Sequence, residues 1–327
     1  MAGSAYGVLS DVNPKLGLSE RRKAFKPISF LVTSPVSDIS SISSGEEIKK
    51  LDLSQIKTIK ELGVTNFSRV VLIEEKDGRK MVLKNFKPNI SFEKIKYEHQ
   101  MLLGMEHQNI SGCDPYIYLN DDGSYSIKMD YIEGNALKDI DKEKLDLHIQ
   151  NILVSVFTAL DYLETQKTVH RDLHPGNILF NETTKKAYLI DFGIAKKEGV
   201  EDLFDKQGGI DRYRTTPESI KEPNKANPQS NMWALGIMLF SLYLGKSIYD
   251  CLKDDGLKDQ GSADLGEARV TWELQSLDKA SLADDAGATK EIKNISNPKV
   301  QAIIGRCLIA DPAERLTPKG ALEILKA

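Results

Sequence analysis

Short runs of apolar residues dominate the pattern from residue 56 to residue 131. Five of these runs are rich in Val, Ile, Leu or Tyr and predict β-strands: 56–62, 69–74, 80–86, 116–119 and 125–131. Asp77-Gly78 lies between the second and third runs, where this dipeptide is a strong hairpin signal. The turn residues of 120–123 join the last two runs. The pattern therefore predicts a small antiparallel sheet.

Helical periodicity replaces this pattern in the rest of the chain. Apolar residues recur at helical spacing from Phe92 to Met105, which predicts one helix within the strand-rich part. After residue 136 we expect mainly helices, at 147–166, 229–244, 299–310 and 318–326. The segment 229–244 is apolar almost all round and is expected to be a buried central helix. A strand-rich part followed by a helix-rich part predicts an α+β fold with two lobes.

These elements divide the chain into three expected regions. Residues 1–52 contain a Ser-rich run with little apolar surface to bury, so we expect a flexible extension there. The small lobe is expected over 53–132 and the large helical lobe over 133–327. Within the large lobe, 249–297 is polar and mostly acidic, and it is predicted to be a surface insertion. The alternative is a docking segment for a partner, with Trp272 as the residue to probe.

Charge and composition exclude several classes of partner. The chain has 44 basic and 48 acidic residues, so it lacks the basic excess that is typical of nucleic-acid binding. Its longest apolar stretch, Met232–Gly245, is too short to span a bilayer. The three cysteines are far apart, which argues against a disulfide framework and fits a reducing compartment. We therefore predict a cytoplasmic protein that binds neither nucleic acid nor membrane.

Three motifs carry the chemistry. The sequence HRDLHPGN occupies His170–Asn177, and a DFG triplet follows at Asp191–Gly193, directly after apolar Tyr188–Ile190. Upstream, Met81–Lys84 reads MVLK and falls on the third predicted strand. In this order, the motifs resemble those of the eukaryotic-type protein kinase family, and the resemblance extends from about Leu53 to the C-terminus. It implies a bilobal protein-kinase-like fold that uses ATP and Mg²⁺ to phosphorylate protein substrates.

The resemblance also assigns roles to single residues. Asp172 would accept or orient the proton of the acceptor hydroxyl, which is a general-base role. Lys84 would contact the α and β phosphates, with Glu98 of the predicted helix as its ion-pair partner. Asp191 and Asn177 would bind Mg²⁺.

The adenine site follows from the same resemblance. Met129 would be the gatekeeper, and the backbone of Asp130 and Ile132 would hydrogen-bond the base. Three apolar side chains would sandwich the ring: Val70, Val82 and Leu179. Gly63 would begin the glycine-rich loop that covers the phosphates.

Three features depart from the family pattern. The glycine-rich loop keeps only Gly63, and the added side chains of Thr65 and Ser68 are expected to weaken nucleotide binding. His174 stands where Ser/Thr kinases carry Lys, and it would neutralise the transferred phosphate only when protonated. Asn231 replaces an Asp that anchors the catalytic loop, so we expect a softer loop.

The segment between Asp191 and Glu218 suggests how activity is controlled. It has no Ser or Thr between Lys196 and Arg214. We therefore expect activity without phosphorylation of this segment, with Arg171 paired to one of its acidic residues: Asp202, Asp205 or Asp211. By resemblance, Glu218 would form a structural ion pair with Arg315.

The leading prediction is a protein Ser/Thr kinase, because Pro175 follows the family's Ser/Thr pattern. We also expect this kinase to phosphorylate itself. Two alternatives stay open. LHPGN also occurs in small-molecule kinases of the aminoglycoside and choline type, and the degraded glycine loop is compatible with a nucleotide-binding pseudokinase scaffold. The Ser-rich N-terminus before a divergent kinase also resembles bacterial effector kinases that are delivered into host cells.

Overall fold

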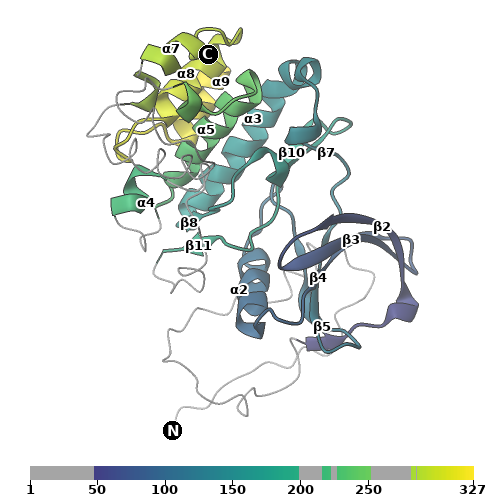
Figure 1. The fold of residues 1–327 in the computed structure, drawn as a ribbon. Helices are drawn as coiled ribbons and strands as arrows, with labels where there is room; N and C mark the ends of the chain where they lie inside the picture. The colour runs from purple at the N-terminus through teal and green to yellow at the C-terminus, as the bar shows by residue number, and fades with distance from the viewer. Residues whose placement is uncertain (1–47, 199–215, 222–226, 252–280, 285) are drawn as a thin grey trace, which may run out of the picture. The chain divides into compact units, whose positions relative to one another are not determined.

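The computed structural model of the chain describes residues 48–198, 216–221, 227–251, 281–284 and 286–327 (Figure 1). These residues divide into two compact units. The first comprises the described residues up to Glu106 together with Ser111–Tyr131, and the second comprises His107–Ile110 and the described residues from Ile132 onward. Several expectations lie outside the described residues: those for 1–47, for Asp202, Asp205 and Asp211, and for Trp272.

A six-stranded sheet forms most of the first unit (Figure 1). Its strands are β1 (Ile48–Lys50), β2 (Ile56–Val64), β3 (Ser68–Glu75), β4 (Lys80–Phe86), β5 (Cys113–Leu119) and β6 (Tyr125–Asp130). Across the sheet they run in the order β1-β5-β6-β4-β3-β2. All neighbouring pairs are antiparallel except β1 with β5, which is parallel. The five strands expected from the sequence are therefore all present.

Strand β1 is an element that the sequence analysis missed. Its three residues, Ile-Lys-Lys, are too few to show a period, and they fall in the range that was expected to be a flexible extension. The following residue, Leu51, is buried with core residues of the sheet. The sheet therefore begins before residue 53, inside the expected extension.

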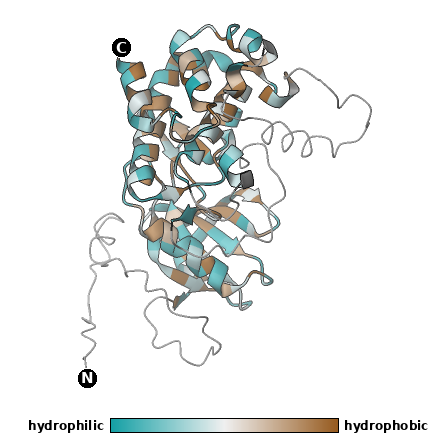
Figure 2. Cartoon of the chain, turned by 90° about the vertical axis from the view of Figure 1, so that its left-hand side faces the viewer, coloured by the Kyte–Doolittle hydropathy of each residue, from teal (hydrophilic) through white to brown (hydrophobic). Residues whose placement is uncertain are grey.

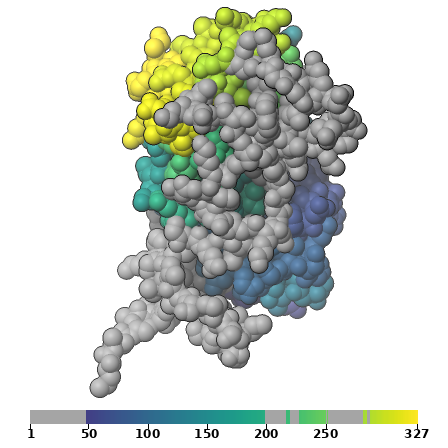
Figure 3. All heavy atoms as spheres, turned by 60° about the vertical axis from the view of Figure 1, so that its left-hand side comes forward, coloured from purple at the N-terminus to yellow at the C-terminus, as the bar shows by residue number. Residues whose placement is uncertain are grey.

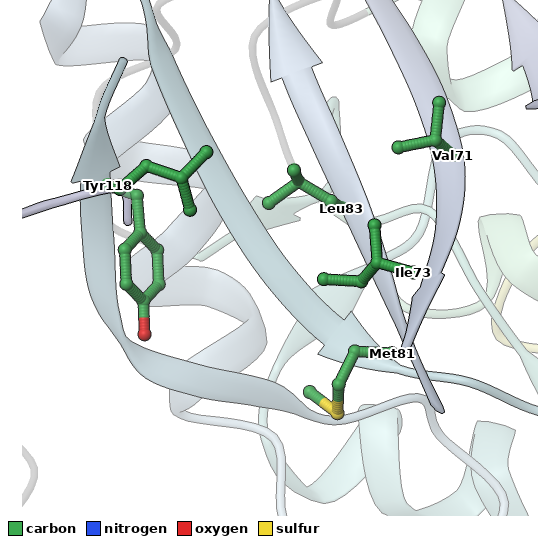
Figure 4. Close-up of a cluster of buried hydrophobic side chains, with 6 residues drawn as sticks. Val71, Ile73, Met81, Leu83 and Tyr118 are labelled. Atoms are coloured by element: carbon green, nitrogen blue, oxygen red, sulfur yellow. The ribbon is translucent and has the colours of Figure 1, made fainter. Parts of the chain in front are cut away.

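The core on one face of this sheet explains the register of its strands. Val71, Ile73, Met81, Leu83 and Tyr118 form a buried cluster (Figure 4). Ile73 lies opposite Met81 and Val71 lies opposite Leu83 in the antiparallel pair of β3 and β4. Because side chains alternate between the two faces of a strand, these pairs point the same way.

The turn between β3 and β4 forms as the dipeptide signal predicted. Gly78 has a φ of +82°, a conformation that a residue with a Cβ adopts only with strain, and its amide donates to the Glu75 carbonyl at 2.8 Å. Helix α2 (Phe92–Leu103) follows β4 and packs against β5, burying Ile95, Met101 and Leu102.

Helices form most of the second unit. They are α3 (Lys142–Thr165), α4 (Pro217–Lys221), α5 (Ser230–Leu244), α7 (Ala286–Ile292), α8 (Pro298–Cys307) and α9 (Pro318–Lys326). Brown and teal residues alternate along several of the helices in Figure 2, as in helices with one buried and one exposed face. Helix α3 begins five residues before the predicted start because Asp141 caps it, with its Oδ1 accepting from the Lys144 amide at 2.8 Å. Helix α5 is buried along its length, and its Trp233 is 0% exposed.

Short strands complete the second unit. Strands β9 (Ile178–Asn181) and β10 (Lys186–Leu189) form a hairpin, and β7 (Asn135–Ala136) pairs with β9. Strands β8 (Thr168–Val169) and β11 (Lys196–Lys197) form a separate pair. Within the described ranges, no helix is both long and apolar enough to cross a lipid bilayer.

The last part of the 249–297 range differs from the polar insertion expected there. Leu282, Ala288 and Ile295 are buried, and the Leu282 amide donates to the Leu308 carbonyl at 2.8 Å. These residues belong to the packed C-terminal region, whose surface is yellow-green to yellow in Figure 3. The sequence analysis missed this because the apolar residues are isolated among polar ones.

Candidate active site

Lys84 of β4 and Glu98 of α2 form a buried ion pair in the first unit. Lys84 Nζ lies 2.6 Å from Glu98 Oε1, and the side chains are only 11% and 6% exposed. The two residues are 14 positions apart, so the packing of α2 is needed to bring them together. A lysine held in this way keeps its ammonium group at a fixed point on the sheet.

Apolar side chains share the sheet face that carries Lys84. In the strand register Val70 lies opposite Lys84, and Val82 lies opposite Met129. Because cross-strand partners and alternate residues point to the same side, all four belong to one face. Val70, Val82 and Met129 are only half-buried, so this face offers apolar surface beside a cation. The Asp130 amide donates to the Gly112 carbonyl at 2.9 Å, so this amide is used within the sheet region.

The β9–β10 hairpin brings together the two motifs of the second unit. Ile178 pairs with Leu189, so the preceding Asn177 and the following Ile190 lie at the same end of the hairpin. The Ile190 amide donates to the Asn177 carbonyl at 3.0 Å, and Asp191 comes next, with a φ of +61°. Asn177 Nδ2 donates to the backbone carbonyl of Asp172 at 2.9 Å and to its Oδ2 at 3.1 Å. Hydrogen bonds of Asn177 therefore connect Asp172 with Ile190, the residue directly before Asp191.

His170 anchors this arrangement from a buried position. Its ring is 0% exposed, and its Nε2 donates to the Ile190 carbonyl at 3.1 Å. The ring centroid lies 4.6 Å from that of the buried Phe192. Burial lowers the pKa of His170 even though the charges of Asp172 and Asp191 act in the opposite direction. A neutral, buried ring at this point connects the two motifs structurally.

His174, which stands where the family pattern has Lys, hydrogen-bonds within its own turn. Its Nδ1 accepts a hydrogen bond from the Gly176 amide at 3.0 Å. Nε2 lies 3.9 Å from Asp172 Oδ1. A Cβ at Gly176 would lie 2.8 Å from His174 Cε1, so glycine is needed here for the ring to occupy its place. The sequence analysis did not single out Gly176.

Oxygen donors suited to Mg²⁺ are present in this part of the chain. The amide nitrogen of Asn177 is used by Asp172, which leaves its Oδ1 as the atom for a metal. Asp191 adds a carboxylate, whose Oδ1 accepts from the Gly193 amide at 3.2 Å. Among the described residues no three His, Cys, Asp or Glu side chains are clustered for a metal. Two protein oxygens fit Mg²⁺, which usually keeps waters and substrate phosphates as its other ligands.

Asn231 of α5 makes two hydrogen bonds to the backbone of Thr168 and His170, directly before Asp172. Its Oδ1 accepts from the His170 amide at 2.9 Å, and its Nδ2 donates to the Thr168 carbonyl at 3.2 Å. The side chain is 3% exposed. An aspartate could make only the first of these bonds. The sequence analysis counted on one accepted bond, whereas the structure has an asparagine whose donor and acceptor are both used.

We therefore expect Asn231→Asp, the change toward the family pattern, to destabilise the protein. It would place a carboxylate oxygen against the Thr168 carbonyl in a buried site and reduce the free energy of unfolding by about 1–3 kcal/mol. Urea unfolding followed by tryptophan fluorescence measures this. Asn151→Asp on the exposed side of α3 is the matched control, expected to change stability by less than about 0.5 kcal/mol. An Asn231→Asp variant as stable as the parent would contradict the prediction.

Arg315 has all five of its N–H donors satisfied. It forms a bidentate pair with Glu218 through N–O distances of 2.8 and 2.9 Å. The other three bonds go to the carbonyls of Gln229, Ile309 and Ala310 at 2.9, 2.9 and 3.1 Å. Burial by itself would raise the pKa of Glu218, but the hydrogen bonds and charge of Arg315 outweigh it and hold this pKa below its usual value. The pair is the one expected from the sequence.

Two further residues of the second unit, Ser230 and Asn109, make contacts that the sequence analysis missed. Ser230 donates to Glu218 Oε1 at 2.7 Å, beside Arg315. Asn109 Nδ2 donates to the Ala187 carbonyl at 2.8 Å, and the Asn109 carbonyl accepts from the Leu189 amide at 2.8 Å. Asn109 thereby fixes the strand that leads to Asp191. Asn109 belongs to a short loop, and a single polar residue there does not stand out in the sequence.

Comparison with known proteins agrees with this geometry. Residues 56–326 match the family described as the protein kinase domain. Similar proteins include a megakaryocyte-associated tyrosine-protein kinase of Mus musculus, 25% identical over 84% of this chain and 50% of the relative. The serine/threonine-protein kinase PknA of a Nostoc species is 23% identical over 84% of this chain and 47% of the relative.

A third relative, the serine/threonine-protein kinase ppk25 of Schizosaccharomyces pombe, is 27% identical over 55% of this chain and 43% of the relative. The chain thus spans about half the length of the curated relatives it matches. The α+β fold, the ordered motifs and a family match over most of the sequence agree, and the chain belongs to the protein kinase domain family.

Proposed function

We propose that the chain transfers the γ-phosphoryl group of Mg²⁺-ATP to Ser and Thr hydroxyls of protein substrates, and to hydroxyls of its own. The arrangement of Asp172, Asn177 and Asp191 carries the proposal, because the hydrogen bonds of Asn177 hold a candidate base and two candidate metal ligands in one place. Mg²⁺ would neutralise phosphate charge when bound by Asn177 and Asp191.

The chain's own residues would divide the remaining work. Lys84, fixed by Glu98, would contact the α and β phosphates, and Asp172 would orient the acceptor hydroxyl. Val70, Val82, Met129 and Leu179 would contact the adenine ring, with the backbone of Asp130 and Ile132 as hydrogen-bonding groups. Such positioning and charge neutralisation account for most of the catalysis in phosphoryl transfer.

One residue of the motif supports Ser and Thr as the acceptors. Pro175 follows the Ser/Thr pattern, whereas the relatives include both Ser/Thr and tyrosine kinases. The buried Glu218–Arg315 pair favours a protein kinase over a small-molecule kinase, since it supports the segment that follows the DFG motif in protein kinases. The complete set of Lys84, Glu98, Asp172, Asn177 and Asp191 favours an active enzyme over a pseudokinase.

The deciding experiment measures transfer of labelled γ-phosphate from Mg²⁺-ATP to the chain itself and to a generic basic protein. Asp191→Ala and Asp172→Ala serve as controls. We expect label that requires both aspartates and Mg²⁺, and phosphoamino-acid analysis that returns phosphoserine and phosphothreonine. Phosphotyrosine alone would move the proposal to tyrosine kinases. ATP binding without any transfer would favour the pseudokinase alternative.

The contact between Gly176 and His174 gives a sharper prediction. Gly176→Ala would push a Cβ into the His174 ring and displace its Nε2 from the position beside Asp172. We expect kcat for transfer to fall by about 10- to 100-fold, a range typical of a small misplacement in an active site, with KM for ATP little changed. Gly305→Ala in α8 is the matched control, because a Cβ there meets no atom within 4 Å. Equal rates for both variants would contradict the role of His174.

A further inference from the structure

The turn between β2 and β3 is closed by a threonine side chain. The Thr65 amide donates to the Ser68 carbonyl at 2.8 Å, which forms the turn itself. Thr65 Oγ1 in addition accepts from the Phe67 amide at 3.1 Å and from the Ser68 amide at 3.0 Å. Two successive backbone amides of the turn are thus satisfied by one hydroxyl oxygen.

These amides belong to the loop that covers the phosphates in protein kinases. Successive backbone N–H groups in a turn make a site for an anion, and glycine leaves them open because it has no side chain to accept their hydrogen bonds. Thr65 stands at the second glycine of that pattern, between Gly63 and Ser68. Its hydroxyl oxygen occupies the acceptor position that the Phe67 and Ser68 amides would offer to a phosphate oxygen.

We propose that Thr65 is a positioning residue that holds the phosphate-binding amides in an internally bonded state, so that nucleotide must displace its hydroxyl. The inference rests on the proposed nucleotide-binding function and concerns the regulation of that same site. The neighbouring residues support it. Ser68 is 1% exposed and its Oγ lies 3.4 Å from Thr65 Oγ1, so a buried hydroxyl adds a further contact to the threonine hydroxyl.

Gly63 makes no comparable demand on the loop. Its φ is not in the left-handed region, and a Cβ added to it would meet no atom within 4 Å. The state of the turn is therefore set by the hydroxyl of Thr65 and not by the one glycine that remains. The weakening of nucleotide binding expected from the sequence then has a specific atomic cause, namely competition for two amides.

Thr65→Val tests this with the smallest change, because valine keeps the shape and β-branching of threonine and removes only the hydroxyl. The backbone bond from residue 65 to the Ser68 carbonyl is retained. Net hydrogen-bond strengths predict that freeing two amides tightens binding of ATP and ADP by about 5- to 30-fold. Adenosine, which has no phosphate, should bind the variant and the parent equally. Thr65→Ser keeps the hydroxyl and is the matched control, expected to behave as the parent.

Calorimetry with the full chain measures the three affinities, and amide hydrogen exchange gives a readout that needs no nucleotide. Without ligand, the Phe67 and Ser68 amides should exchange more slowly in the parent and in Thr65→Ser than in Thr65→Val. Equal exchange in all three proteins would overturn the proposal, as would weaker ATP binding by Thr65→Val. If the parent bound neither adenosine nor ATP, the proposed function would fail, whereas hydrogen exchange would still decide whether Thr65 holds these amides.

Discussion

Replacing Asp172 with alanine is expected to reduce kcat for phosphoryl transfer by about 10²- to 10⁴-fold, the range typical of lost general-base assistance. KM for ATP should change little, because Asp172 is proposed to act on the acceptor hydroxyl and not on the nucleotide. The structure indicates that the substitution leaves the position of Asn177 unchanged. Asn177 would still donate to the backbone carbonyl at position 172, a bond of 2.9 Å that does not involve the substituted side chain.

Steady-state kinetics with Mg²⁺-ATP and a generic basic protein measures this split between kcat and KM. Asp139→Ala, at an exposed position of the same unit, is the matched control and should retain the parent rate. Thermal unfolding of each variant separates lost chemistry from lost folding. If Asp172→Ala kept more than about a tenth of the parent kcat, the base role would be wrong.

The second large effect concerns stability. Arg315→Ala is expected to lower the free energy of unfolding by about 3–5 kcal/mol, because it leaves the Glu218 carboxylate without the partner that compensates its burial. The Arg315 side chain is 0% exposed, so the lost bonds are poorly replaced by water. Lys326→Ala is a suitable control, since its pair with Glu323 is 70% and 71% exposed and should contribute less than about 1 kcal/mol.

The pH dependence of the free energy of unfolding provides an independent test of the Glu218–Arg315 pair. The pKa of Glu218 is lower in the folded protein than its usual value of 4.5. The ion pair therefore contributes its full stabilisation above pH 4.5, the pKa of a Glu in the unfolded chain. This stabilisation is lost as the pH falls from 4.5 through the lower pKa of Glu218 in the folded protein. Glu218→Gln mimics the protonated carboxyl group. The stability difference between parent and Glu218→Gln should be full at neutral pH and shrink in acid, and a difference independent of pH would contradict the assignment.

Local patterns determined most of the secondary structure. The β-branched runs of β2, β3 and β4 and the Asp77-Gly78 turn depend on neighbouring residues, so the sequence predicts them without knowledge of the fold. The all-round apolar composition of α5 likewise required a buried position. Strand β1 is different, because three residues gain a partner only when β5 is already in place.

Motif order alone also named the residues of the candidate site. The spacing of Lys84, Asp172, Asn177 and Asp191 resembles that of protein kinases, and the family match over 56–326 confirms the resemblance. The sequence could name Glu98 as the partner of Lys84, but the 2.6 Å contact depends on how α2 packs. The catalytic roles of these residues stay predictions until the kinetics are measured.

The tertiary structure determined the hydrogen-bond partners of three residues that depart from the family: Thr65, His174 and Asn231. When only the residue type is known, the replaced glycine suggests weaker nucleotide binding, the replaced lysine suggests less charge neutralisation, and the replaced aspartate suggests a softer loop. The structure instead shows Thr65 accepting from two amides, His174 accepting from Gly176, and Asn231 using both its donor and its acceptor. Residue type and spacing are properties of the sequence, whereas the partner of each donor and acceptor depends on which backbone groups folding brings within hydrogen-bonding distance.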